Sequence, residues 1–321
     1  MTFRENTNAT RARRLGFTLV ELLVVITIIG ILAGLALVAL QGVPGAVRNT
    51  AVKMELTQIG QALDLYKQER GSYPPDGTSL LTANTDRTAA INRHLNVLFP
   101  QRSATLDTPT NDATRLQAMI DAGYVSNLGH TTNDYQLHQI DPTEAYVIFL
   151  MGFSPNIELP LTGTGERTPM FEFDQTRLSD PDGDGWWSYK PAYHDSEIVY
   201  FNAKSYATSS SGTITGISTV DFSTISGSLA SGIARPYATV GPNGSIQWVN
   251  DNTFQLMSAG SDADFGNFSD STTPATAVKL YPSGLQDTSV YANSINYTLE
   301  DLDNVANFTE GSTLEADEDL E

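Results

Sequence analysis

Residues 13–21 read RRLGFTLVE and lead directly into an apolar run that ends at Leu40. From Phe17 to Leu40 there are 24 residues, and Glu21 is the only charged one among them. At about 1.5 Å per residue, a helix of this length would reach about 36 Å, enough to cross the hydrocarbon core of a bilayer. We therefore predict a transmembrane helix over residues 17–40.

Glu21 is unexpected in a helix that serves only as a membrane anchor. A carboxylate inside such a segment costs about 2.5–3.5 kcal/mol on insertion scales. A positive charge at the same depth on a neighbouring copy of the helix would offset this cost. The position of Glu21 therefore indicates that the helix associates with other helices.

These residues resemble the amino terminus of the type IV pilin and type II secretion pseudopilin superfamily. The pattern of that family is a basic leader, a glycine before the cleavage site, a phenylalanine after it and a glutamate at the fifth mature position. This chain has Gly16, Phe17 and Glu21 at those positions, after a leader that contains Arg11, Arg13 and Arg14. The resemblance implies that a prepilin peptidase removes residues 1–16 and methylates the new amino terminus at Phe17. It also implies assembly into a helical filament with the same or other pilins and pseudopilins.

The charges agree with that implied assembly. Cleavage before Phe17 creates an ammonium group four residues from Glu21, and this group can pair with Glu21 of an adjacent subunit. Basic residues before the helix and an acidic body after it orient the amino end towards the cytoplasm. We expect a single-pass protein of the inner membrane with its bulk in the periplasm. It would then pass into a filament with the help of an inner-membrane assembly platform.

Composition limits the possible partners. The chain has 321 residues and a net charge of −19, and removal of a leader with four arginines and one glutamate leaves about −22. Such acidity disfavours nucleic acid and anionic lipid as partners and favours cations. There is no cysteine, so neither a disulfide framework nor a lipoprotein anchor is available.

A second helical pattern follows the apolar run. Apolar residues recur at spacings of 4, 3, 4 and 3 at Val52, Leu56, Ile59, Leu63 and Tyr66. This spacing predicts an amphipathic helix that ends near Arg70, with Gly71 as its cap. Residues 41–45, which contain two glycines and a proline, form a predicted weak point between the two helical segments. We predict an α+β, pilin-like fold in which a long helix over residues 17–71 packs on an antiparallel β-sheet and loops are inserted.

The remaining chain divides into three predicted regions. Residues 72–134 are interpreted as an insertion with helices near 89–98 and 113–122, and residues 135–299 as the globular sheet domain. The predicted strands are Tyr135–Gln139, Tyr146–Phe149, Ile198–Phe201, Ile246–Val249 and Thr253–Ala259. Residues 205–231 are predicted to form an exposed loop or loose hairpin. Residues 300–321 hold nine acidic residues and no basic ones, and we expect a solvated, frayed tail. A tail that attracts cations or partners is the alternative, and Leu302, Val305 and Phe308 offer apolar side chains that would dock its first part.

The run DPDGDG at residues 180–185 fits the first half of a calcium loop. Asp180, Asp182 and Asp184 alternate and can point to one centre, and oxygen ligands favour calcium over transition metals. The twelfth position is Pro191 instead of glutamate, so the loop is not a complete EF-hand, and Asp195 and Glu197 are candidates for further ligands. The alternative is a polar turn without metal.

A second acidic turn, residues 258–266, follows a predicted strand and reads SAGSDADFG. It is similar to the "SxGxDxxxG" turn of the pseudopilin G subfamily, where that turn belongs to a calcium-binding region. The resemblance implies a calcium ligand at Asp262, with Asp264 in support, and a simple solvated turn is the alternative. The resemblance to this subfamily covers residues 11–75 well and residues 135–270 in patches.

No enzyme is predicted. The four histidines, at 94, 130, 138 and 194, stand in no metal-ligand spacing, and neither GxSxG nor a phosphate-binding loop is present. We predict a structural subunit of a type II secretion pseudopilus. One alternative is a major or minor pilin of a type IV pilus, which serves adhesion, motility or DNA uptake. Another is a membrane-tethered extracytoplasmic binding module or enzyme, which would tolerate Glu21→Leu.

Overall fold

The computed structural model describes residues 19–40, 43–78, 80–81, 83–127, 134–211 and 213–318, without the side chains of residues 33–44. The leader, the Gly16–Phe17 bond and residues 41–42 of the predicted weak point lie outside this description. The chain divides into two compact units, Met1–Ala46 and Val47–Glu321.

The first unit contains helix α1, Leu19–Leu40, which is 22 residues long. Glu21 lies in its first turn, where a carboxylate interacts favourably with the positive end of the helix dipole. The described side chains of α1 are exposed throughout. In the described part of the chain, no helix reaches the combination of length and apolar character that a membrane span needs.

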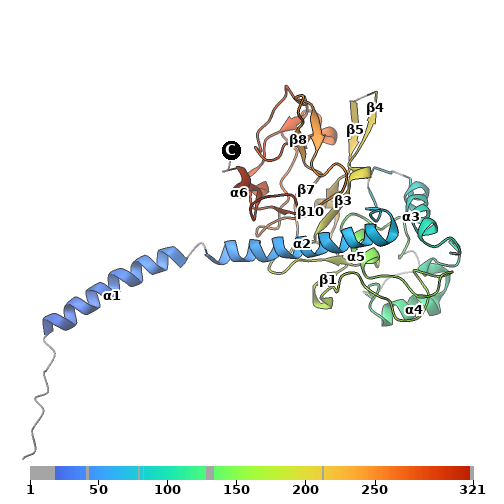
Figure 1. Ribbon diagram of the computed structural model, residues 1–321, viewed down its shortest axis with the longest axis horizontal. Helices are drawn as coiled ribbons and strands as arrows, with labels where there is room; N and C mark the ends of the chain where they lie inside the picture. Colours follow the sequence, from blue (N-terminus) through green and yellow to red (C-terminus); the bar gives the residue numbers. More distant parts are fainter. Residues whose placement is uncertain are drawn as a thin grey trace, which may run out of the picture. The chain divides into compact units, whose positions relative to one another are not determined.

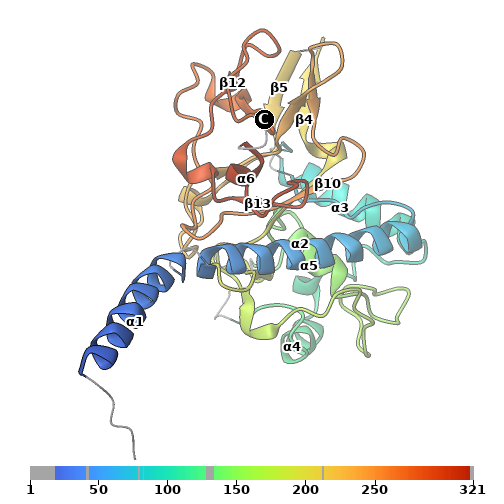
Figure 2. The same cartoon turned by 60° about the vertical axis from the view of Figure 1, so that its left-hand side comes forward.

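The second unit is built around helix α2, Val43–Arg70, and a three-stranded antiparallel sheet. The sheet has the order β13-β10-β3, with bounds Val305–Ala306, Phe254–Ser258 and Val199–Asn202. Leu256 in the central strand pairs with Tyr200, and Met257 pairs with both Val199 and Ala306. In both ribbon views, the later β elements and α6 lie on one side of α2, and α4 and α5 lie on the other (Figures 1 and 2).

Both faces of this sheet are buried, and alternate residues of its strands enter different cores. Tyr200, Leu256 and Val305 join a core with the apolar stripe of α2, whose five predicted members are fully buried. Val199, Met257 and Ala306 face a second core made with the later loops and hairpins. Because neither face meets water, β3 and β10 are buried at every position instead of alternating between polar and apolar residues.

The other elements surround this centre. The further helices are α3 (Asn84–Leu98), α4 (Ala113–Asp121), α5 (Ala145–Leu150) and α6 (Leu314–Glu318). Antiparallel pairs are formed by β1 (Leu178–Ser179) with β2 (Ser188–Tyr189), β4 (Ala207–Ser210) with β5 (Thr213–Ile217), β6 (Val220–Asp221) with β7 (Ile233–Ala234), and β8 (Ala238–Val240) with β9 (Ile246–Trp248). A parallel pair joins β11 (Val278–Lys279) to β12 (Ser294–Ile295).

The α+β prediction is confirmed, and so are the strands at β3, β9 and β10, the two helices of the insertion and the hairpin after Ser205. The prediction of a strand at Tyr146–Phe149 is wrong, because these residues form α5. All six residues of α5 are buried, so its apolar run has no polar face from which a helical period could be recognised. The predicted strand at Tyr135–Gln139 is also absent. Tyr135 there has a positive φ of 64°, which is incompatible with an extended strand.

The expectation of a frayed carboxyl terminus is wrong for residues 300–318. Val305 is fully buried and belongs to the central sheet, and Leu314 at the start of α6 is equally buried. Asp317 accepts hydrogen bonds from the backbone N–H groups of Glu310 and Gly311. The acidic residues of this segment thus serve partly to close its own turns.

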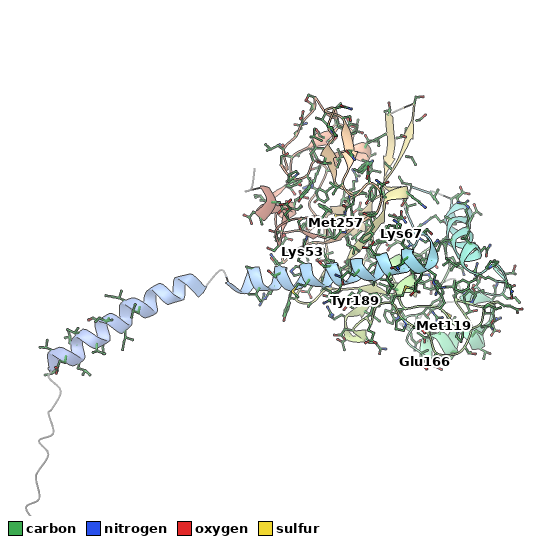
Figure 3. The ribbon with its side chains drawn as sticks, viewed as in Figure 1. Lys53, Lys67, Met119, Glu166, Tyr189 and Met257 are labelled. Carbon is green, nitrogen blue, oxygen red and sulfur yellow. The ribbon has the colours of Figure 1, made fainter. Side chains whose placement is uncertain are left out.

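Helix α2 is held on two sides by polar contacts (Figure 3). Lys53 Nζ donates to the carbonyl oxygens of Ala306 and Thr309, at 2.6 and 2.5 Å. Glu55 Oε1 accepts from Tyr189 OH at 2.8 Å, and both Glu55 oxygens contact the Arg177 guanidinium. These contacts fix the rotation of α2 between the β1–β2 hairpin and the carboxyl-terminal segment.

Glu55→Ala should lower the free energy of unfolding by about 3 kcal/mol, because it leaves the half-buried Arg177 and the buried Tyr189 hydroxyl without their acceptor. Denaturant titration of the detergent-solubilised chain measures this loss. The matched control is Glu69→Ala on the exposed side of the same helix, which should change stability by less than about 0.5 kcal/mol. Equal effects of the two substitutions would contradict the assignment.

Candidate functional site

The first candidate surface is α1 itself. Its apolar side chains from Leu19 to Leu32 are between 46% and 85% exposed, and no Cβ built on Gly30 would meet any atom within 4 Å. Glu21 is exposed among them. An apolar surface on every side of residues 19–32 is not stable against water and must be covered by lipid or by other helices. Phe17 and Gly16 lie outside the described residues, so their predicted roles stay predictions.

The second candidate is the acidic run at residues 180–185, hereafter the 180–185 loop. Asp180 is buried, and its carboxylate accepts hydrogen bonds from the backbone N–H groups of Gly183, Asp184 and Gly185 at 3.0–3.2 Å. These hydrogen bonds close the turn that carries Asp182 and Asp184. Both carboxylate oxygens of Asp180 accept these hydrogen bonds. The contacts do not test its predicted role as a calcium ligand.

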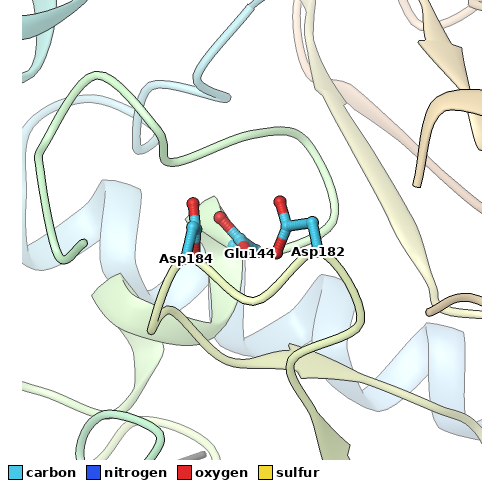
Figure 4. Close-up of side chains that lie close together, drawn as sticks. All are labelled: Glu144, Asp182 and Asp184. Atoms are coloured by element: carbon cyan, nitrogen blue, oxygen red, sulfur yellow. The ribbon is translucent and has the colours of Figure 1, made fainter. Parts of the chain in front are cut away.

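Asp182 and Asp184 lie close to a third carboxylate, which was not predicted from the sequence. Glu144, next to the start of α5, contributes an oxygen that lies within 4.8 Å of an oxygen from each aspartate. Figure 4 shows the three carboxylate groups side by side. We call Glu144, Asp182 and Asp184 the carboxylate cluster. Among the described residues, it is the one group of three or more His, Cys, Asp or Glu side chains that lie close enough to share a metal ion.

Protonation is favoured throughout the carboxylate cluster. Burial, followed by the charge of Asp182, raises the pKa of Asp184 to about 8. Partial loss of water, followed by the charge of Asp141, raises the pKa of Asp182 to about 7, although part of this residue is exposed. Burial and the neighbouring aspartates raise the pKa of Glu144 well above its usual value. Three carboxylates without a counter-charge hold protons more tightly, because adjacent negative charges repel one another.

A local signal could have identified Glu144. In the run Asp141-Pro142-Thr143-Glu144, Glu144 Oε2 accepts from the backbone N–H of Asp141, and Asp141 Oδ1 accepts from that of Thr143. The exchange resembles a capping box, except that Asp141 accepts from Thr143 N–H and not from Glu144 N–H, and it closes the turn just before α5 begins at Ala145. Recognition of that pattern would have predicted α5 and placed Glu144 at its amino end.

The second acidic turn follows β10. Asp262 Oδ1 accepts from the backbone N–H of Asp264, and Asp264 accepts from Gly266 N–H and from Ser231 Oγ. Loss of water contact, together with the charge of Asp303, raises the pKa of Asp262 to about 6. Neither residue joins the carboxylate cluster, and a calcium ligand at Asp262 stays a prediction.

The two further ligand candidates, Asp195 and Glu197, lie elsewhere. Asp195 is exposed, and the fully buried Glu197 contacts Lys190 at 3.6 Å and accepts from Ser228 Oγ at 2.7 Å. Glu197 thus has its own cation, and neither residue belongs to the carboxylate cluster.

Comparison with known proteins gives a match that covers the first candidate surface, α1. The Prokaryotic N-terminal methylation motif matches residues 11–37. The chain carries a prepilin-type amino terminus. This motif includes Gly16, Phe17 and Glu21 and extends through most of α1.

The relatives match the same end of the chain. The type II secretion system core protein G of Pseudomonas aeruginosa is 39% identical over 64 residues, which are 20% of this chain and 45% of that protein. The proteins of the same name from Klebsiella pneumoniae and Aeromonas hydrophila are 40% and 38% identical over 62 and 64 residues. The match thus spans less than half the length of these relatives. Their names describe a secretion-system component and no enzymatic activity. No solved structure matches the chain.

Asp180→Ala should destabilise the protein by about 2–3 kcal/mol, because three backbone N–H groups lose their shared acceptor. Thermal unfolding in buffer that contains a chelator measures this loss without any contribution from metal. Asp195→Ala, which removes an exposed aspartate, is the control and should have little effect. A melting temperature that stays unchanged in Asp180→Ala would refute the capping role.

Proposed function

We propose that this protein is a structural subunit of a type II secretion pseudopilus that assembles through its amino-terminal helix. The methylation motif over residues 11–37 carries the proposal, because it coincides with a helix whose described apolar side chains are all exposed. The similarity to core protein G supports a secretion system over an adhesive or motile pilus. The protein acts as a building block and not as an enzyme.

In this proposal, α1 and the residues just before it reside in the inner membrane until assembly. Lipid covers the exposed apolar side chains of α1 before assembly, and neighbouring subunit helices cover them afterwards. The second unit, Val47–Glu321, stays in the periplasm, because the basic leader holds the amino end of the helix on the cytoplasmic side. A head-to-tail contact that does not close on itself then produces an open helical filament.

Glu21 sets the register of that filament. After cleavage, the Phe17 ammonium of an incoming subunit pairs with the Glu21 carboxylate of its neighbour, and each charge is neutralised where water is absent. An ion pair in low dielectric is strong only when both partners are present, because an isolated buried charge is severely penalised. A subunit that is out of register would leave both groups unpaired, so the pair selects a single axial position.

The mature protein should begin with N-methylated Phe17. Mass spectrometry of the protein from a strain with a prepilin peptidase should give a chain without residues 1–16 and with one added methyl group. Gly16→Leu, which enlarges the residue before the cut, should retain the leader. A protein that still begins with Met1 in the presence of the peptidase would contradict the proposal.

Glu21→Leu should leave processing and membrane insertion intact and should reduce assembled filament at least tenfold. The substitution makes insertion easier by removing a carboxylate that costs about 2.5–3.5 kcal/mol, so lost assembly could not arise from failed insertion. Filament is measured by shearing and sedimentation, and membrane content by fractionation.

The control is Leu22→Ile, which alters the neighbouring residue but keeps the charge pattern. Normal filament yield from Glu21→Leu would favour a simple membrane tether, which has no use for the carboxylate.

A further inference from the structure

We propose that the carboxylate cluster, Glu144 with Asp182 and Asp184, binds one structural calcium ion. The site goes beyond the filament function and does not depend on it. It joins two segments about 40 residues apart in the sequence, the turn before α5 and the 180–185 loop.

A buried oxygen without a partner distinguishes this cluster from an ordinary group of acidic residues. Asp184 is only 6% exposed, and its Oδ1 accepts from the backbone N–H of Trp186 at 2.9 Å. Its Oδ2 is fully buried and has no hydrogen-bond partner among the described residues. A buried carboxylate oxygen without a donor is strongly disfavoured unless a cation or water satisfies it. The Asp184 carboxylate lies beside that of Glu144 (Figure 4).

No basic side chain neutralises the cluster within the part of the chain that the structure describes. The ion pairs found there include none with Glu144, Asp182 or Asp184. Glu144 is 1% exposed, so its charge has little access to water. A divalent cation supplies the missing positive charge to all three groups at once.

The geometry and the ligand atoms favour calcium. Oxygens within 4.8 Å of one another are close enough to share one ion after small side-chain adjustments, and the usual calcium–oxygen distance is about 2.3–2.6 Å. All three ligands are carboxylates, which disfavours metals that prefer nitrogen or sulfur. Magnesium holds a strict octahedron at about 2.1 Å and retains most of its waters, so a site with three carboxylates fits calcium better. Asp182 is exposed, and water can complete the coordination there.

The surrounding structure orients the ligands before any ion arrives. Asp180 closes the 180–185 loop through three backbone N–H groups, and the Asp184 carbonyl accepts from Tyr135 N–H at 2.7 Å. The adjacent Trp186 is buried in the main core, and its Nε1 donates to the Gln136 carbonyl. A bound ion would therefore connect this loop to α5 and stabilise the core between them.

Calcium binding is measured by titration calorimetry on the full-length, detergent-solubilised chain after treatment with a chelator. At the carboxylate cluster we expect one calcium ion, at least tenfold weaker binding of magnesium and a higher melting temperature with calcium. E144Q, D182N and D184N should each weaken calcium binding at least tenfold. D182N changes an exposed loop residue, so it remains informative if the two buried variants do not fold.

The melting temperatures of the variants without calcium distinguish the loss of a calcium ligand from a general loss of stability. Each of the three variants places a neutral amide in a cluster that disfavours a charged carboxylate, so it should melt no lower than the wild type without calcium. D195N and D262N are controls at acidic residues outside the cluster and should keep wild-type affinity. Absence of calcium binding, equal affinity for magnesium, or wild-type affinity in D182N and E144Q would each overturn the proposal. Loss of binding in D262N alone would assign the ion to the turn after β10 and would also overturn it. Filament yield is not part of this measurement, so its outcome is independent of the proposed function.

Discussion

Burial of one stripe of α2 against a sheet covered on both faces is the constraint on which the second unit depends. Val52, Leu56 and Ile59 are completely buried, and every residue of the strands β3 and β10 is buried too. The second face of this sheet is as apolar as the first, so other elements must cover it as well. The later hairpins and the carboxyl-terminal segment supply that second layer.

Several acidic side chains in this protein accept hydrogen bonds from backbone N–H groups. Asp180 and Asp317 each accept from backbone N–H groups in a turn, and Asp107, fully buried, accepts from Leu161 and Thr162 N–H and pairs with Arg102. A net charge of −19 is therefore not all on the surface. The carboxylate cluster differs from these residues because its buried oxygen at Asp184 has no such donor.

The features that sequence predicted are those encoded by local periodicity. The α2 stripe, the helices α3 and α4 and the apolar strands β3 and β10 each carry their pattern within a few turns or residues. Helix α5 was mistaken for a strand because it is apolar on every side. The tail was expected to be frayed because of its charge. Val305 is buried, as its docking requires, whereas the burial of Leu314 was not predicted. Asp182 and Asp184 could be identified from their own loop. The local hydrogen bonds of residues 141–144 could place Glu144 before α5, but only the tertiary fold shows that it lies beside the two aspartates.

The final strand has a consequence for the order of folding. β13 lies at residues 305–306, and Lys53 of α2 contacts Thr309 across 256 positions of sequence. Closing a contact of that separation requires nearly the whole chain to be present, and long-range pairing slows folding. The sheet thus stays incomplete, with one side of β10 unpaired, until residues 305–306 are available to pair with it. Until then, the folding domain presents an open edge on β10, which is a site for unwanted pairing with other strands.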